Sequence, residues 1–404
     1  MVHFTGDPAR EWPETLDVAA MLAGGWRPQP FRQFLLKVHS RCNLACDYCY
    51  VYTLADQSWR SRPMAMTPEL VATAARRIAE HAHHHGLDYV RIILHGGEPL
   101  LAGHDYLGKI VEIVRSETGD HPRVEASVQT NAVLLTEPAL RSFAELDVKV
   151  GVSLDGNRRA NDRNRRYADG RGSYDAVAAA LELLMSPAYR ALYGGLLCTI
   201  DLSNDPLETY EALVAFEPPV IDFLLPHATW DSPPPGRPGD QSEPLYGRWL
   251  TKIFDLWYDT ADAPVVRIFQ EIVQLLLGGA SRSEAVGLTP TSLIVIETDG
   301  TIEQTDSLKA VGHGAPATGL NLAEHSLDAA LRHPGIVARQ LGWDALSDTC
   351  KGCRFSRVCG AGLYPHRYRA GTGFLNPSVY CADLYWLIEH IRARLVSDLR
   401  RSSV

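Results

Sequence analysis

The stretch RCNLACDYCYVY, residues 41–52, places three cysteines within eight residues. Cys42, Cys46 and Cys49 follow the spacing C-x3-C-x2-C, and Tyr48 and Tyr50 flank the last thiol. A structural zinc site is normally closed by four protein ligands. Three thiolates on a [4Fe–4S] cluster would instead leave one iron open to a molecule from outside the chain. The stretch therefore predicts a metal centre with one open corner, with a zinc loop or chance clustering as the alternative.

The eight cysteines of the 404-residue chain are clustered, because three lie at 42–49, four lie at 350–381 and only Cys198 stands alone. In a cytoplasmic protein, clustered cysteines favour metal binding over disulfides. No apolar run approaches the ~20 residues that cross a bilayer, and the N-terminus has no secretory pattern. A net charge of −9 argues against a nucleic-acid binder. We expect a cytoplasmic protein that binds neither nucleic acid nor membrane.

Apolar runs and helical stretches alternate between residues 33 and 226. Thr67, Thr136 and Ser173 begin three of the helical stretches. The repeated order of strand and helix predicts an α/β array, and periodicity leaves a partial barrel and an open sheet equally possible. The expected parallel strands are 34–38, 90–94, 124–128, 148–152, 196–200 and 221–225.

The chain changes character after this array. Residues 231–244 are rich in proline and glycine and predict a linker or an exposed loop. Helical stretches follow at 245–259 and 265–278, and 292–306 predicts a hairpin that turns at Asp299 and Gly300. The expected parts are an N-terminal segment 1–32, the array 33–230, a linker with helices 231–289 and a smaller unit 290–404.

Further motifs follow successive strands. In HGGEPL, residues 95–100, two glycines let the backbone approach a ligand closely, and Glu98 could receive an ammonium group. SVQTNAVLL and GVSLDG follow at the third and fourth strands, and NDRNRRYADGRGSYDAV comes next. Their order after the cysteine loop resembles the radical SAM superfamily, in which a [4Fe–4S] cluster binds S-adenosylmethionine (SAM).

The resemblance implies a partial (β/α)6 barrel of the TIM type. It implies that the three clustered cysteines hold the cluster, and that cleavage of SAM yields a 5′-deoxyadenosyl radical that abstracts hydrogen from a substrate. An arginine is expected on the SAM carboxylate, and we choose Arg165 over Arg166. The expected SAM-binding residues are Tyr48, His95, Gly96, Gly97, Glu98, Asn131, Ser153, Asp155 and Arg165.

A second cysteine group, Cys350, Cys353, Cys359 and Cys381, is spaced C-x2-C-x5-C-x21-C. Four thiolates can saturate zinc or a [4Fe–4S] cluster, and spacing alone does not separate the two. The group resembles the C-terminal part of the SPASM domain of peptide-modifying radical SAM enzymes. That resemblance implies an auxiliary [4Fe–4S] cluster.

The chain departs from the SPASM pattern at three cysteine positions. Thr305 and Leu363 replace two of the cysteines, and nothing upstream supplies the third. The resemblance implies that the missing thiols would bind the cluster nearer the active site. We therefore expect one auxiliary cluster and not two.

The motifs DGTIEQTDSLK, CGAGLYPHRYR and NPSVYCADL resemble the FxsB-type branch of SPASM maturases. This branch implies an enzyme that forms a cyclophane, a bond from an aromatic side chain to a β-carbon, in a ribosomally made precursor peptide. The implied partners are that peptide and a flavodoxin- or ferredoxin-like electron donor. The alternatives are a sulfatase-maturase-like oxidase of serine or cysteine and a zinc-binding peptide-recognition protein without catalysis.

Other polar residues receive simpler interpretations. Asp222 and His227, near the end of the sixth strand, are candidate proton acceptors, although structural hydrogen bonds are the commoner role. Cys198 is expected to fill apolar space, and the histidines at 81–85 are expected at a solvated helix end and not in a metal site. We expect the precursor peptide to pair with an exposed strand edge at 291–304.

Overall fold

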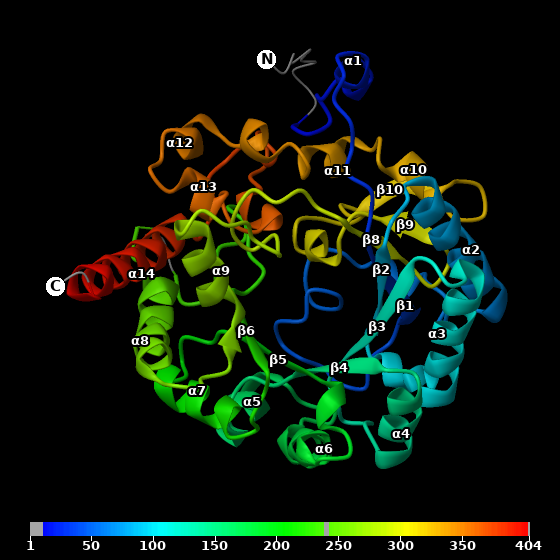
Figure 1. Cartoon of the computed structure of the whole chain (residues 1–404), viewed down its shortest axis with the longest axis horizontal. Coiled ribbons are helices and arrows are strands. Elements are labelled where there is room, and N and C mark those ends of the chain that lie inside the picture. Colours follow the sequence, from blue (N-terminus) through cyan, green and yellow to red (C-terminus); the bar gives the residue numbers. More distant parts are fainter. Residues whose placement is uncertain (1–10, 238–241, 403–404) are drawn as a thin grey trace.

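A computed structural model describes residues 11–237 and 242–402 of the chain. Its centre is a curved sheet that stays open between its two edge strands in the described part (Figure 1). Six neighbouring parallel strands form the barrel wall, so the predicted partial (β/α)6 barrel is confirmed. These strands are β1 (Gln33–His39), β2 (Tyr89–Gly96), β3 (Arg123–Thr130), β4 (Val148–Ser153), β5 (Tyr193–Thr199) and β6 (Val220–Leu224).

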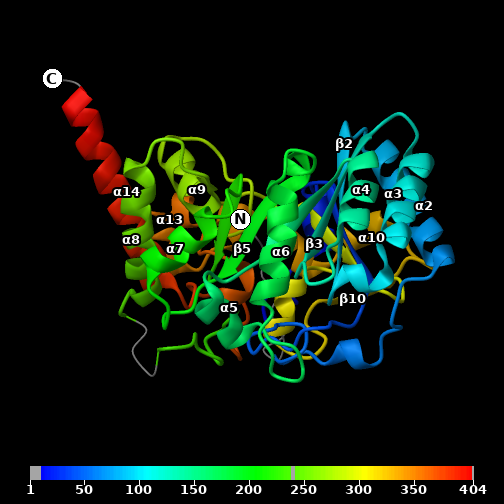
Figure 2. The same cartoon turned by 90° about the horizontal axis from the view of Figure 1, so that it is seen from below.

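Helices cover the outer side of this sheet, as the view from below shows (Figure 2). Thr67 begins a helix as predicted, because its Oγ1 accepts a hydrogen bond from Leu70 N at 3.3 Å. The hydroxyl of Ser173 instead donates to the carbonyl of Arg165 at 2.8 Å. The outer helices are α2 (Pro68–His84), α3 (His104–Thr118), α4 (Glu137–Glu145), α5 (Arg158–Asn164), α6 (Tyr174–Met185) and α7 (Pro206–Val214).

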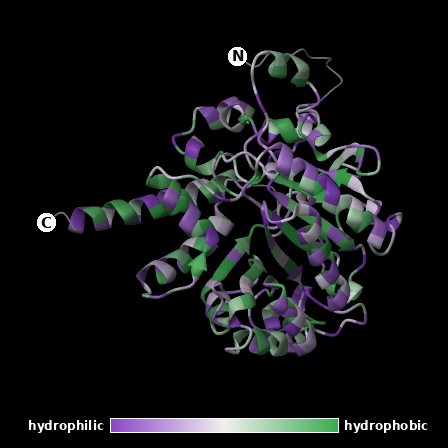
Figure 3. Ribbon diagram, turned by 45° about the vertical axis from the view of Figure 1, so that its right-hand side comes forward, coloured by the Kyte–Doolittle hydropathy of each residue, from purple (hydrophilic) through white to green (hydrophobic). Residues whose placement is uncertain are grey.

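The two faces of the parallel strands differ in polarity. In β2, Val90, Ile92 and Leu94 are buried, whereas Arg91 and His95 lie on the opposite, inner face. β3 and β4 alternate in the same way, and Figure 3 shows hydrophilic and hydrophobic positions mixed along the ribbons. A cavity of about 1370 Å³ lies along the inner face. Arg123, Asp147 and Lys149 line this cavity, so it lies toward the amino ends of β3 and β4.

The sheet continues into the C-terminal unit. β8 (Leu293–Ile296) pairs in parallel with β1 and antiparallel with β9 (Thr301–Glu303), and β10 (Ala317–Asn321) lies beside β9. The predicted turn at Asp299 and Gly300 is confirmed, with Gly300 at φ +81°. The expected strand edge at 291–304 is wrong, because β8 and β9 each have a strand on both sides. The edge strands are β10 and β7 (Val265–Val266).

The predicted linker is partly packed against the C-terminal unit. Arg237 is buried, forms an ion pair with Asp383 and donates from Nη1 to the carbonyl of Val379 at 3.1 Å. An exposed loop is therefore wrong at Arg237, and 238–241 lie outside the described residues. Both predicted helices that follow are confirmed as α8 (Leu245–Asp259) and α9 (Arg267–Leu276).

The remaining helices are short except for the last one. α14 (Cys381–Ser402) extends away from the body of the molecule (Figures 1 and 2). Within 11–237 and 242–402, no helix combines the length and the apolarity that crossing a membrane requires. The short helices are α1 (Val18–Ala23), α10 (Leu327–Ala330), α11 (Pro334–Ala338), α12 (Asp348–Lys351), α13 (Ser356–Cys359), η1 (Ser58–Arg60), η2 (Pro99–Ala102), η3 (Arg190–Leu192), η4 (Asp306–Ala310), η5 (Gly342–Ala345) and η6 (Tyr364–Arg367).

Candidate active site

The three-thiol loop begins where β1 ends and is fastened to the end of α5. Ala45 N donates to Arg166 O at 2.7 Å, and Asp47 N donates to Asn164 O at 3.2 Å. The thiols share one partly buried region. Burial raises the pKa of Cys42 to about 12, with contributions from Glu98 and from the other two thiols. Buried thiols keep their protons unless a cation stabilises the thiolates. The loop is therefore suited to a metal centre and not to a free thiolate.

The spacing of the sulfur atoms can be compared with that of a zinc site. Tetrahedral zinc with Zn–S bonds of about 2.3 Å places its sulfur ligands about 3.8 Å apart. No three cysteine sulfurs in the described part of the chain lie within 4.8 Å of one another. In the described part of the chain, the cysteine sulfurs are therefore not gathered as tightly as the ligands of a tetrahedral zinc site.

Gly96 and Gly97 lie directly against the loop. A Cβ atom on Gly96 would be 2.1 Å from the carbonyl oxygen of His39, and one on Gly97 would be 1.8 Å from Tyr52 Oη. Gly97 N donates to His39 O at 2.9 Å. These glycines allow the end of β2 to contact the start of the thiol loop, which any side chain would prevent.

The carboxylate of Glu98 joins the ends of β2 and β3. It is fully buried and accepts hydrogen bonds from Leu100 N at 2.9 Å, Thr130 Oγ1 at 2.6 Å and Asn131 N at 2.8 Å. Burial raises its pKa, while these hydrogen bonds act in the opposite direction. The Glu98 carboxylate, which was expected to receive an ammonium group, thus accepts hydrogen bonds from three donors of the protein.

Tyr48, Asp155 and Arg165 form a buried polar triad beside the loop. The Tyr48 hydroxyl contacts Asp155, and Arg165 Nη1 donates to Tyr48 Oη at 2.9 Å. Thr199 N donates to the other Asp155 oxygen at 2.9 Å. Arg165 is only 7% exposed, and its Nε has no hydrogen-bond partner among the described residues. A buried guanidinium with a free N–H is suited to a carboxylate ligand.

The other expected SAM residues lie at the same ends of the strands. Asn131 Nδ2 donates to Asn43 Oδ1 at 2.8 Å and lies 3.7 Å from Cys42 Sγ. Ser153 Oγ accepts from Gln129 Nε2 at 3.1 Å. The structure thus gathers the expected residues from five segments of sequence at the carboxyl end of the barrel, where α/β barrels bind ligands.

Residues 36–196, from β1 into β5, match the family model of the radical SAM superfamily. These residues form a radical SAM domain. The expected SAM and [4Fe–4S] cofactors are confirmed with this assignment. The comparison with known proteins extends beyond the matched domain.

Curated relatives align with most of the chain. The cysteine-type anaerobic sulfatase-maturating enzyme of Clostridium perfringens is 25% identical over 378 residues, covering 91% of this chain and 98% of the relative. The serine-type anaerobic sulfatase-maturating enzyme of Klebsiella aerogenes is 26% identical over 377 residues, covering 91% and 87%. These matches give no support to the FxsB-type branch.

Solved structures share the fold of this radical SAM enzyme. Native anSMEcpe with bound AdoMet has a TM-score of 0.76 at 21% identity, covering 91% of this chain and 99% of that one. SuiB of Streptococcus suis bound to precursor peptide SuiA has a TM-score of 0.57 at 12% identity, covering 90% and 78%. The similarity includes the C-terminal unit, so the expected SPASM-like architecture is confirmed.

The residues around the loop fit these cofactors. Cys42, Cys46 and Cys49 would hold the SAM-binding cluster, and the free Nε of the buried Arg165 would face the carboxylate of SAM. When bound, the cluster and SAM supply a radical that abstracts a hydrogen atom from the substrate. The protein itself gathers the thiols, orients the guanidinium and keeps water from the buried carboxylates.

The second cysteine group gathers where three short helices meet. Cys350 lies in α12, Cys359 ends α13 and Cys381 begins α14. Burial raises the pKa of Cys359 to about 12, and Cys381 and Cys350 contribute to the shift. Cys353 likewise acts on Cys381. Four mutually close thiols would hold the auxiliary cluster and tie the three helices together.

A buried ion pair inside the barrel joins two residues that the sequence motifs do not single out. Lys37 of β1 pairs with Asp306 of η4, and both side chains are at most 6% exposed. Lys37 Nζ also lies 3.4 Å from His95 Nδ1. Burial alone would raise the pKa of Asp306, but Lys37 and Lys309 lower it. Asp306 therefore stays ionised in the barrel interior. A lysine within the apolar run FLLKVH was the available sequence signal.

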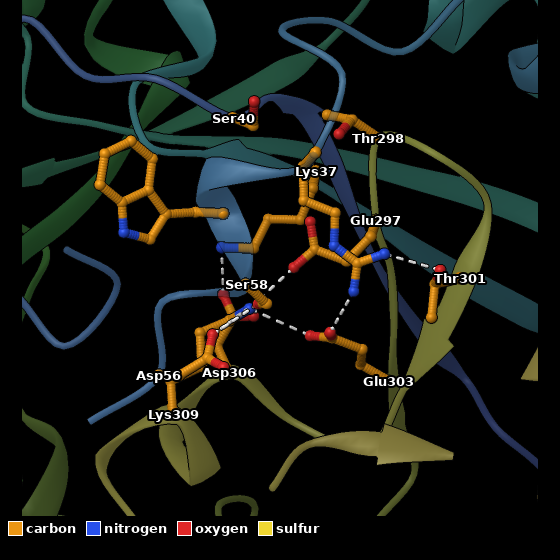
Figure 4. A network of polar contacts seen from close by, with 12 residues as sticks. Lys37, Ser40, Asp56, Ser58, Glu297, Thr298, Thr301, Glu303, Asp306 and Lys309 are labelled. Atoms are coloured by element: carbon orange, nitrogen blue, oxygen red, sulfur yellow. Dashed lines mark hydrogen bonds and ion pairs between the residues drawn. The ribbon is translucent and has the colours of Figure 1, made fainter. Parts of the chain in front are cut away.

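A network centred on Lys309 lies beside Asp306 (Figure 4) and helps to lower the pKa of Asp306. Lys309 Nζ lies 2.9 Å from Glu297 Oε1, 3.1 Å from Glu303 Oε2 and 3.7 Å from Asp56 Oδ2. Burial and the neighbouring Glu297 raise the pKa of Glu303 to about 7. Glu297, Glu303 and Asp306 are spaced closely enough for a metal ion, but the ammonium group of Lys309 already supplies the positive charge between Glu297 and Glu303.

The two weaker candidates occupy different surroundings. The ring of His227 lies 4.6 Å from that of Tyr50 and 6.3 Å from that of His366, and Asp306 acts on its charge. Asp222 instead pairs with Arg267 at 3.3 Å, and burial raises its pKa. Both line a cavity of about 310 Å³, together with Leu363 and His366. His227 thus stays a candidate close to Asp306, and Asp222 has a structural partner of its own.

Replacing Arg165 by methionine is expected to weaken SAM binding roughly 10- to 100-fold, because a hydrogen bond to a charged group contributes about 1.5–3 kcal/mol. Arg166→Met is the matched control, since Arg166 pairs with Asp47 at the surface. Equilibrium dialysis with labelled SAM on anaerobically purified protein measures both. Equal affinities of the two variants would remove Arg165 from the SAM site.

Three buried histidines predict a fold that weakens in acid. Burial lowers the pKa of His95 and of His227 to about 4, and lowers that of His366 well below its usual value. In the unfolded chain histidines titrate near about 6.5, so unfolding takes up protons as the pH falls from there. Stability is therefore lost between about pH 6.5 and pH 4. His366→Gln should reduce the dependence of the unfolding free energy on pH by up to about 1.4 kcal/mol per pH unit. Urea midpoints measured across this pH range give that dependence. An unchanged dependence would show that His366 is not neutral in the fold.

Proposed function

We propose that this radical SAM enzyme oxidises a serine or cysteine side chain of a peptide or protein, as a sulfatase-maturase-like enzyme. The similarity to sulfatase-maturating enzymes over 91% of the chain supports this function. The neighbours with bound peptides, anSMEcpe with Cp18Cys peptide and SuiB with SuiA, support a peptide substrate. The expected external electron donor, a flavodoxin- or ferredoxin-like protein, belongs to the same proposal.

The observation that carries the proposal is an ionised carboxylate in the barrel interior. Removing a hydrogen atom from the β-carbon of serine leaves a carbon radical. The aldehyde forms when that radical loses one electron, which the auxiliary cluster would accept when bound, and the hydroxyl loses one proton to a base. Asp306, held ionised by Lys37, is the proposed base, and His227 is its alternative.

Cyclophane formation is the second candidate. It begins with the same hydrogen abstraction and also ends with the loss of one proton and one electron, here from an aromatic ring that bonds to the β-carbon. Thr305 and Leu363 favour it, because they stand where SPASM domains carry cysteines, and Leu363 lines the cavity beside His227. The long similarity to sulfatase-maturating enzymes places it second.

One incubation separates the candidates. Anaerobic enzyme, SAM and a reductant are mixed with serine or cysteine peptides, or with a peptide of repeated aromatic-x-x motifs. A product that reacts with a hydrazine probe carries an aldehyde and supports the oxidase. A cyclophane product has lost two hydrogens and does not react with the probe. Its backbone also resists mass-spectrometric fragmentation across three residues. Cleavage of SAM without change in any peptide would contradict both.

A further inference from the structure

The histidine-rich end of α2 forms a compact cluster with α10. His81 Nδ1 contacts Asp328 Oδ1, and His85 Nε2 lies 3.0 Å from the same oxygen. His84 Nε2 lies 3.9 Å from the second oxygen. His81 is only 2% exposed, so the expectation of a solvated helix end is wrong for this residue. The candidate ligand atoms of His81, His85 and Asp328 all lie within 4.8 Å of one another.

The contacts of His81 place an acceptor at each ring nitrogen. Its Nε2 lies 3.2 Å from the carbonyl oxygen of Phe31, and its Nδ1 contacts the carboxylate of Asp328. Neither oxygen has a proton to donate, and a neutral imidazole carries only one N–H, so a neutral ring leaves one lone pair against an oxygen. A cation at Nδ1, either a second proton or a metal ion, satisfies both contacts. Donation from the outer nitrogen to a backbone carbonyl is also the usual way in which a protein orients a metal-binding histidine.

The cluster has the shape of a chelating site with a protected and an open side. His81 and His85 are four residues apart at the end of α2 and project from one face, with ring centroids 4.6 Å apart. Phe31 and Phe34 pack against His81 on the inner side. On the outer side, Asp328 is partly exposed and His84 is largely exposed. An ion could therefore enter from solvent and be held against an apolar wall.

The cluster around Asp328 differs from the Lys309 network in its source of positive charge. There, an ammonium group already lies between the carboxylates at 2.9 and 3.1 Å. Among the charged groups that the structure describes within ion-pair distance of Asp328, all are histidines. No lysine or arginine in the described part of the chain is paired with it to supply the cation.

We propose that His81, His85 and Asp328 bind a zinc-type divalent transition-metal ion, with His84 or water as the remaining ligand. Imidazole and carboxylate ligands suit zinc and its neighbours in the first transition row. The site would have no sulfur ligand, so it is separate from both cysteine groups. Asp328 belongs to α10, and the histidines lie at the C-terminal end of α2. The ion would therefore connect the C-terminal unit to the barrel.

The test uses full-length protein with its iron–sulfur clusters intact. Wild type, His85→Asn, Asp328→Asn and the control His83→Asn are incubated with Zn²⁺, desalted and analysed for zinc and iron. His83 is the matched control because it is exposed on the same helix and contacts the carbonyl of His121 at 2.9 Å instead. We expect one retained zinc in wild type and in the control, loss of zinc in the other two, and the same iron in all four.

X-ray absorption at the zinc edge and thermal unfolding give readouts independent of activity. The retained zinc should show nitrogen and oxygen neighbours at about 2.0–2.1 Å, and Zn²⁺ should raise the Tm of wild type but not of Asp328→Asn. The proposal is overturned by no zinc in wild type, by sulfur neighbours, or by equal zinc in all four proteins. If folded wild type retains no zinc, the positive charge between His81 and Asp328 is a second proton on His81.

Discussion

Replacing Cys42, Cys46 and Cys49 together by alanine is expected to abolish the release of 5′-deoxyadenosine from SAM, down to the level of protein-free controls. These three thiols are the proposed holders of the cluster, and the four thiols at 350–381 belong to the C-terminal unit and cannot take their place. The variant should keep about four of the roughly eight irons of two clusters. Chromatography of anaerobic incubations with SAM and dithionite, together with iron analysis, measures both quantities.

Cys198→Ala is the control for this experiment. Cys198 is buried in β5 and belongs to neither cysteine group. It should keep the full iron content and should cost stability only through lost packing, typically about 1–2 kcal/mol for so small a change. Continued SAM cleavage by the triple variant would show that the thiol loop is not the reactive centre.

Replacing Asp306 by asparagine is expected to stop product formation while SAM cleavage continues. The isosteric amide cannot accept the proton, and loss of a general base typically costs about 10²- to 10⁴-fold in rate. It also leaves Lys37 buried without its partner, which destabilises a protein by about 3–5 kcal/mol. Peptide product and 5′-deoxyadenosine are quantified in the same incubation, so that the two effects are seen separately.

A double variant separates chemistry from stability. Lys37→Met with Asp306→Leu replaces the ion pair by apolar side chains, which is often close to neutral for stability. We expect the urea midpoint to recover towards wild type while product stays absent. Normal product formation by the double variant would exclude Asp306 as the base and would direct attention to His227.

The barrel could be predicted because its determinants are local. Apolar runs, helix start signals such as Thr67 and the Asp299–Gly300 turn all act within a few residues. The pairing of β8 with β1 could not, since it joins 33–36 to 293–296 and leaves no trace in either segment alone. That pairing is also why the edge expected at 291–304 is covered.

The site shows the same division. The thiol loop, the two glycines and Arg165 stand in contiguous motifs, so they can be identified from the sequence. Asp306 reaches Lys37 from 269 positions away, and Asp328 reaches His81 from 247. Only the folded chain brings these partners together, and no periodicity in the sequence reports such a pairing. The buried lysine in β1 was the one visible sign.

We infer that three thiolates leave one corner of a [4Fe–4S] cluster open for SAM. The most direct test is electron–nuclear double resonance on the reduced variant that lacks Cys350, Cys353 and Cys359, with SAM labelled in its amino and carboxylate groups. Coupling of both labels to the remaining cluster is the predicted result. A spectrum that SAM leaves unchanged, or a centre that proves to be zinc, would contradict it.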